Sequence, residues 1–68
     1  MSETERIGLL IAKLRKERKL SQRQFAERVG MTQTEISRIE VGRHAARLES
    51  LAKIAKGLGM ELGFINSL

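Results

Sequence analysis

The strongest constraint on this chain is a pair of helix-start signals set eleven residues apart, in the segment LSQRQFAERVGMTQTEISRIE at residues 20–40. Ser21 is followed three positions later by Gln24, and Thr32 is followed three positions later by Glu35. A hydroxyl residue with Gln or Glu at the third helical position forms a capping box, which satisfies backbone donors at a helix N-terminus. We therefore expect two short helices joined by a tight turn at Gly30.

Apolar residues around these signals predict how the two helices are anchored. Leu20 and Phe25 are spaced to form a hydrophobic staple across the first cap, and Met31 and Ile36 are spaced to form one across the second. The second helix is expected to close at Gly42, because glycine readily adopts the left-handed conformation that ends a helix. The two helices together span residues 21–41.

Two further helices are predicted on either side. The first should begin near Thr4 or Glu5 and run to about Arg18, with a buried stripe at the i, i+3, i+4, i+7 spacing: Ile7, Leu10, Ile11 and Leu14. The last should run from about Leu48 to Leu58 and stop at Gly59, with Arg47 as a poor N-cap. Its broad apolar face comprises Leu48, Leu51, Ala52, Ile54, Ala55 and Leu58.

The C-terminal tail, residues 60–68, changes period. Met60, Leu62 and Phe64 alternate with Glu61, Gly63 and Ile65, which favours a short strand. A lone strand has no partner within the chain, so we expect it to pair with the same strand of a second copy, with Ile65 also at this dimer contact. The alternative is a fifth short helix packed on the core.

Composition places the chain in a class. Its 68 residues allow one small domain, residues 1–68, and the helical pattern predicts an all-α bundle of four to five helices. The absence of cysteine removes disulfides and thiolate metal sites. No apolar run is long enough to span a bilayer, so we expect a cytoplasmic protein with no membrane partner. A net charge of +5 favours a polyanionic partner. The alternative is that the basic surface serves solubility only.

The second short helix carries a polar stripe suited to nucleic acid. At about 100° per residue, Ile36 and Ile39 point one way, whereas the other side presents a continuous stripe without acids. That stripe comprises Gln33, Thr34, Ser37, Arg38 and Val41. Glutamine can bond adenine and arginine can bond guanine in the major groove of double-stranded DNA. The preceding helix would lie across the backbone, with Gln22 near a phosphate.

The segment LRKERKLSQRQFAERVGMTQTEISRIEVGR resembles the helix-turn-helix of the Cro/repressor (Xre-type) family of DNA-binding proteins. The resemblance covers about residues 7–59. It is carried by Arg15, the LSQ at 20–22, Ala26, Gly30, Ile36, Ser37, Glu40 and Gly42. It implies a lambda-repressor-like fold in which Ala26 lets the two helices approach closely. It also implies an ion pair between Arg15 and Glu40.

The resemblance further implies DNA contacts, position by position. Base contacts fall on Gln33, Thr34, Ser37 and Arg38; phosphate contacts fall on Ser21, Gln22, Arg23, Thr32 and Arg43. The chain departs from the family at Ala46, where a proline usually precedes the fourth helix, so the roles of Arg47 and His44 stay open. Glu35, in place of a small polar residue, is expected to serve its capping box.

No catalytic constellation, metal-ligand cluster or phosphate-binding loop is evident, so we expect no enzyme, no cofactor and no metal. Two classes of function follow. The first is a homodimeric transcriptional repressor that reads an inverted-repeat operator. The second is an antitoxin that binds a toxin protein and represses its own operon. A controller protein of a restriction–modification system is a third reading, within the DNA-binding class.

Overall fold

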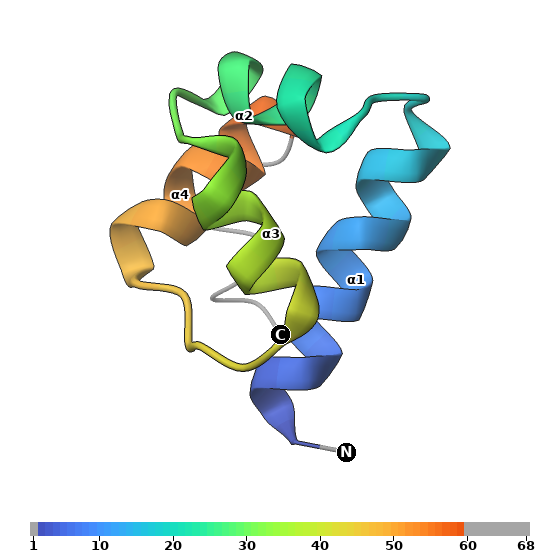
Figure 1. Ribbon diagram of the computed structural model, residues 1–68. Coiled ribbons are helices and arrows are strands. Elements are labelled where there is room, and N and C mark those ends of the chain that lie inside the picture. The colour runs from blue at the N-terminus through green and yellow to red at the C-terminus, as the bar shows by residue number, and fades with distance from the viewer. Residues whose placement is uncertain (1, 60–68) are drawn as a thin grey trace.

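The computed structural model describes residues 2–59, which form four helices and no strand. The helices are α1 (Glu3–Glu17), α2 (Gln22–Val29), α3 (Gln33–Val41) and α4 (Leu48–Gly57). Helix α3 packs against both α1 and α2, and α2 also packs against α4 (Figure 1). The expected all-α class is confirmed for these residues. The predicted strand at residues 60–68 lies outside them.

Both predicted capping boxes are present. The backbone N–H of Gln24 donates to Ser21 Oγ at 3.0 Å, and Ser21 N–H donates to Gln24 Oε1 at 2.9 Å. At α3 the same exchange joins Thr32 and Glu35, at 3.1 Å in each direction. Gly30 ends α2 in the left-handed region with φ 73°. The C-terminus of α2 and the N-terminus of α3 are therefore both capped, which fixes the turn between the two helices.

Helix α1 begins slightly earlier than expected, whereas its C-terminal end, with Arg18 as the C-cap, agrees with the prediction. It begins at Glu3 because Ser2 and Glu5 form a third capping box, which was not among the predicted ones. At the other end Lys19 adopts φ 58°, and the N–H of Leu20 donates to the carbonyl of Arg15 at 3.3 Å. This is a Schellman ending with lysine at the position that glycine usually occupies.

The core lies between the four helices, each of which contributes at least one buried apolar residue. Phe25 and Ile36 are fully buried. Their buried neighbours in the hydrophobic cluster are Ile11, Ala26, Val29, Ile39, Ile54 and Leu58. The partly buried residues that pack on it are Ile7, Leu14, Leu20, Met31, Ala46 and Leu51. Both staple pairs predicted from the sequence are thus part of the core or pack on it.

Two residues predicted to be buried are exposed. Leu10 is 53% exposed, because the side of α1 that faces the core carries Gly8, Ile11 and Arg15 instead. Leu48 is 68% exposed, because it is the first residue of α4 and precedes the turn that packs on the core. In both cases the periodicity predicted the helix correctly, but the predicted buried face included a residue that is exposed.

Glycine allows α1 to lie directly against the end of α3. A Cβ atom on Gly8 would collide with the carbonyl oxygen of Ile39 and would lie 2.9 Å from that of Glu40. Gly42, which ends α3 with φ 80°, leaves room for the Cα of Glu5; a Cβ there would lie 2.7 Å from it. The C-terminal end of α3 therefore lies directly against the first two turns of α1.

Helix α4 starts without help from a side chain, as expected, since Arg47 makes no capping hydrogen bond. It ends near Gly59, which has φ 77°. Arg18 donates to the carbonyl of Leu58 at 2.9 Å and to that of Leu14 at 3.0 Å, so one guanidinium caps the ends of two helices. No helix in residues 2–59 combines the length and the apolar character that crossing a bilayer requires.

Candidate nucleic-acid interface

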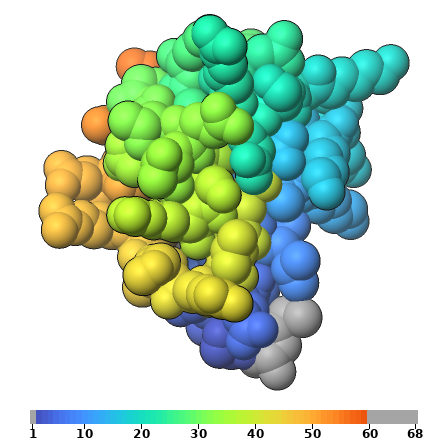
Figure 2. Space-filling model, viewed as in Figure 1, coloured from blue at the N-terminus to red at the C-terminus, as the bar shows by residue number. Residues whose placement is uncertain are grey.

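The helix-turn-helix presents a polar face of α3 to solvent. Gln33, Thr34 and Arg38 are exposed and Ser37 is half-buried, whereas Ile36 and Ile39 on the other side are buried. Figure 2 shows this side of the molecule, where the surfaces of α2 and α3 lie together in front. The structure thus places all four expected base-reading residues on one helix, on the side away from its buried isoleucines.

The acid in α3 is occupied at the helix start. One carboxylate oxygen of Glu35 accepts hydrogen bonds from the N–H and the hydroxyl of Thr32, at 3.1 and 3.0 Å. The hydrogen bond with the Thr32 backbone, followed by the one with its side chain, lowers the pKa of Glu35 below its ordinary value. Glu35 therefore serves the capping box, and its charge lies at the positive end of the α3 dipole.

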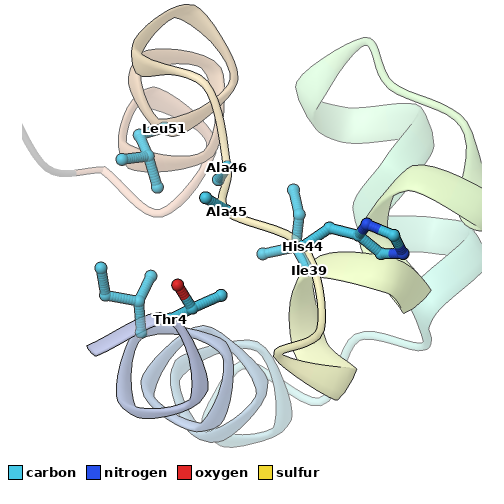
Figure 3. A pocket seen from close by; sticks show the side chains of 7 residues that line it. Thr4, Ile39, His44, Ala45, Ala46 and Leu51 are labelled. Carbon is cyan, nitrogen blue, oxygen red and sulfur yellow. The ribbon is translucent and has the colours of Figure 1, made fainter. Parts of the chain in front are cut away.

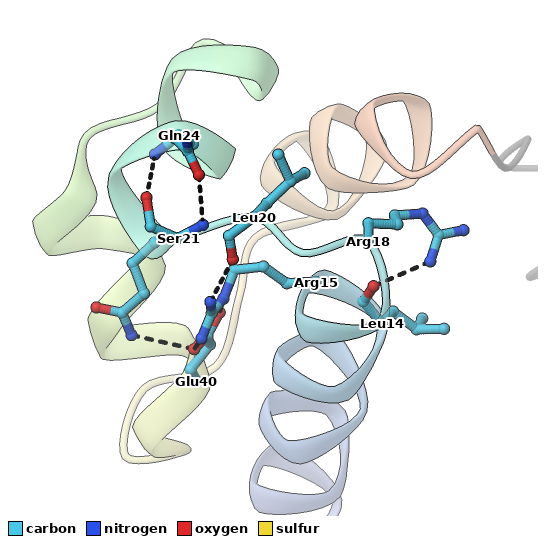
Figure 4. Close-up of polar contacts among 8 residues, drawn as sticks. Leu14, Arg15, Arg18, Leu20, Ser21, Gln24 and Glu40 are labelled. Atoms are coloured by element: carbon cyan, nitrogen blue, oxygen red, sulfur yellow. Dashed lines mark hydrogen bonds and ion pairs between the residues drawn. The ribbon is translucent and has the colours of Figure 1, made fainter.

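A buried ion pair supports α3 from within (Figure 4). Arg15 Nε donates to Glu40 Oε2 at 2.7 Å, and Arg15 Nη2 donates to Glu40 Oε1 at 3.0 Å. Only 9% and 7% of the two side chains are exposed. Arg15 Nη1 also donates to the carbonyl of Leu20 at 2.7 Å. The hydrogen bonds with Glu40 raise the pKa of the Arg15 guanidinium. The pair joins α1, the α1–α2 turn and the end of α3.

Gln22 makes a contact that sequence reasoning did not anticipate. Its amide Nε2 donates to Glu40 Oε1 at 3.0 Å, so the first residue of α2 is tied to the last turn of α3. No local signal in the sequence reports such a bond, because its partners are separated by eighteen residues. The contact links a residue expected to face phosphate to the buried ion pair.

The remaining residues expected to contact phosphate are all exposed. The hydroxyls of Ser21 and Thr32 are engaged in their capping boxes. Arg23 forms an exposed pair with Glu27 at 3.6 Å, of the kind worth little to stability. Arg43 is exposed directly after α3. The Arg23 pair is weak and the Ser21 hydroxyl only accepts in its box, so both groups can still donate to an anion, whereas the Thr32 hydroxyl already donates its one proton to Glu35.

A small hollow lies between α1, the end of α3 and the start of α4 (Figure 3). Its volume is about 60 Å³, far below the 300–1,000 Å³ or so of a typical ligand pocket. Its lining is mostly apolar: Thr4, Ile7, Ile39, His44, Ala45, Ala46 and Leu51. The imidazole of His44 points away from it. Within residues 2–59, no group of three His, Cys, Asp or Glu residues is arranged to hold a metal ion.

Comparison with known proteins assigns the chain to a family. The helix-turn-helix family profile HTH_3 matches residues 11–65. The "ImmF control region 10 kDa protein" of Bacillus phage phi105 is 34% identical over 65 residues, which cover 96% of this chain and 72% of that protein. The "Control protein C.MunI" from a Mycoplasma species is 43% identical over 58 residues, covering 84% of this chain and 78% of its own.

Solved structures have the same fold. A "HTH_3 family Transcriptional Regulator from Vibrio cholerae" superposes with a TM-score of 0.82 and 31% identity, over 93% of this chain and 36% of that one. The "clp gene regulator ClgR from C. glutamicum" superposes with a TM-score of 0.80 over 91% of this chain and 80% of its own, and at 24% identity it supports the fold alone. The chain belongs to the HTH_3 helix-turn-helix family of Cro/C1-type, Xre-like DNA-binding regulators.

Proposed function

We propose that this protein is a transcriptional repressor that binds an inverted-repeat operator as a homodimer and reads bases with α3. The observation that carries the proposal is the exposed face of α3, with Gln33, Thr34 and Arg38 on a helix whose ends are both capped. Helix α3 is narrow enough for the major groove, where amide and guanidinium groups match base edges. Ser37 adds a hydroxyl at the edge of this face.

Phosphate contacts would fix the register of α3 in the groove. Gln22 and Arg23 begin α2, and Ser21 precedes them as its cap. Thr32 caps α3, and Arg43 follows the glycine that ends it. These residues lie on both sides of the base-reading face in the chain, as expected for a helix held between two backbone strands. The net charge of +5 supplies the long-range attraction.

Dimerisation would convert weak binding into operator binding. One module of this size offers few phosphate contacts, which correspond to non-specific affinity. Two modules bound to half-sites about 34 Å apart make the second contact effectively intramolecular. We assign the dimer contact to residues 60–68, on the alternation of Met60, Leu62 and Phe64, with Ile65.

The test is selection of bound sequences from a random pool of DNA duplexes with the purified protein. The salt concentration is about 0.15 M, so that attraction between the protein and the phosphates is screened as it is under physiological conditions. We expect enrichment of an inverted repeat with half-sites separated by one helical turn. Enrichment of a single half-site would overturn the dimer. Flat binding to all sequences, lost steeply with salt, would overturn base reading altogether.

Two arginines separate base reading from phosphate binding. Arg38→Ala should relax preference at one position in each half-site, because a bidentate arginine contact discriminates bases by about 1–3 kcal/mol. Arg43→Ala should weaken binding to all duplexes and lower the slope of log affinity against log salt by about one. Competition with substituted operators measures both. Equal loss on every sequence in the Arg38→Ala protein would remove Arg38 from the base-reading set.

A second candidate is favoured by one comparison. The chain is 43% identical to the "Control protein C.MunI", so the second candidate is a controller protein of a restriction–modification system, which would bind DNA through the same face of α3. The two candidates differ in outcome at the promoter. Expression of a reporter gene placed behind the selected operator should fall if the protein is a repressor. It should rise if the protein is a controller that activates transcription.

A further inference from the structure

The carboxylate of Glu40 is shared between two partners that have different roles. Its Oε2 accepts from Arg15 Nε at 2.7 Å, and its Oε1 accepts both from Arg15 Nη2 and from Gln22 Nε2, each at 3.0 Å. The side chains of Glu40 and Arg15 are almost completely buried, whereas that of Gln22 is half-buried at the start of α2. Glu40 thus connects the protein interior to the edge of the proposed DNA-binding surface.

This connection fixes which way the Gln22 amide faces. A carboxylate paired with a guanidinium has only acceptor oxygens, so it can hold the amide nitrogen of Gln22 and never its carbonyl oxygen. One N–H is then used by Glu40 and the second is left in a set direction. A free glutamine side chain loses rotamer freedom when it is ordered, and here Glu40 has already ordered it before DNA arrives.

We propose that Glu40 is a positioning residue for DNA binding, which orients the second N–H of Gln22 toward a backbone phosphate while touching no DNA itself. The charge of Glu40 does not repel that phosphate, because Arg15 neutralises it through two hydrogen bonds. The ion pair therefore has a second task besides holding α1 on α3. This inference rests on the proposed function, since it concerns a phosphate contact of the same surface.

The experiment is a double-mutant cycle measured as affinity for the selected duplex. In the unchanged background, Gln22→Met keeps the length of the side chain, removes its amide, and should weaken binding about tenfold. The second background is Arg15→Met/Glu40→Met, which removes the acceptor without leaving an unpaired buried charge. There, Gln22→Met should change affinity by less than about twofold, because the amide is no longer oriented.

Arg43→Ala is the matched control, since Arg43 lies outside this network and should lose the same factor of affinity in both backgrounds. If Gln22→Met costs equally much in both backgrounds, Glu40 has only a structural role and the proposal fails. If the double variant does not fold by circular dichroism, Glu40→Asp replaces it, because the shorter carboxylate keeps the charge but withdraws from Gln22. Failure of the unchanged protein to bind any selected duplex would instead overturn the proposed function.

The free protein offers an independent measurement. The two side-chain amide protons of Gln22 should give separate NMR signals, with one shifted by the carboxylate and protected from exchange. On addition of the duplex the other signal should move. In the Glu40→Asp protein both signals should resemble those of an exposed glutamine. Two exposed-type signals already present in the unchanged protein would overturn the proposal.

Discussion

Lys19 shows how one residue can be kept in a conformation that its side chain disfavours. Its φ of 58° places it in the left-handed region, where a residue with a Cβ atom costs roughly 1 kcal/mol more than glycine. Two hydrogen bonds at the end of α1 offset this cost. Lys19 N–H donates to the carbonyl of Lys16 at 2.9 Å, and Leu20 N–H donates to that of Arg15 at 3.3 Å. The turn delivers Ser21 to its capping position at the start of α2.

Replacing this lysine should stabilise the protein. We expect Lys19→Gly to raise the free energy of unfolding by about 0.5–1 kcal/mol, since glycine adopts φ 58° without strain. Lys16→Gly, three residues earlier within α1, should lower it by about 1 kcal/mol through lost helix propensity. Urea unfolding of the two variants measures both signs. A destabilised Lys19→Gly protein would show that the lysine side chain itself contributes to the turn.

At the scale of elements, the position of α3 depends on how closely α1 approaches it. Gly8 lies against the carbonyls of Ile39 and Glu40, and these are backbone atoms that cannot rotate away. The ion pair between Arg15 and Glu40 lies two turns further along α1, on the same face. Contact of α1 with the end of α3 thus combines a close backbone approach with one buried charge pair.

Gly8→Ala tests this close approach. Alanine is the better helix former by about 1 kcal/mol, so on an open helix surface the change would stabilise α1. Here the new Cβ must push α1 away from α3, and we expect a net loss of about 1–3 kcal/mol in the free energy of unfolding. Lys13→Ala, on the exposed side of α1, should change it by less than about 0.5 kcal/mol. A neutral or stabilised Gly8→Ala protein would contradict the packing of α1 on α3.

The capping boxes predict a dependence on pH. The folded-state pKa of Glu35 is lowered by its hydrogen bonds with Thr32, and that of Glu5 by those with Ser2. A carboxylate whose pKa is lower in the folded state contributes stability above its unfolded pKa of about 4.3. That contribution is lost as the pH falls through the folded pKa, because protonation then favours the unfolded chain.

We therefore expect Glu35→Gln to lose less stability than the unchanged protein between pH 6 and pH 3, since glutamine keeps the box without titrating. Gln24→Glu, in the box that starts α2, should lose more over the same range. Thermal unfolding at a series of pH values measures the difference. Parallel pH profiles for all three proteins would show that the capping carboxylates do not contribute to acid unfolding.

At the scale of the whole molecule, a net charge of +5 on 68 residues favours binding to DNA through several individually weak phosphate contacts. The described residues extend over 28 × 25 × 21 Å. A domain of this size spans about one half-site, so in the proposed complex a second copy would supply the rest of the operator affinity. The buried network at Glu40 and the caps at both ends of α3 hold this helix in one orientation within the domain.

Deletion of residues 60–68 tests the assembly. We expect the truncated protein to sediment as a monomer and to lose at least about tenfold in affinity for the inverted repeat, while its non-specific binding stays close to that of the unchanged chain. Phe64→Ser is a milder variant that should shift the same equilibrium. Unchanged sedimentation together with unchanged operator binding would remove this segment from the dimer contact.

The sequence by itself determined the local structure and the chemical character of the site. Capping boxes at Ser21 and Thr32, with glycine at positions 30 and 42, are signals contained within a few residues, and each formed as predicted. The polar stripe of α3 followed from helical periodicity alone. The family resemblance added Arg15 with Glu40, a pair that local patterns do not reveal.

The tertiary structure decided what depends on the relative position of distant segments. The exposure of Leu10 and the burial of Gly8 follow from how α1 rotates against α3, which its own periodicity leaves open. The bonds from Gln22 to Glu40 and from Arg18 to Leu58 join residues 18 and 40 positions apart. Such contacts form only after packing brings helix ends together, because their geometry is set by the whole core rather than by neighbours in the chain.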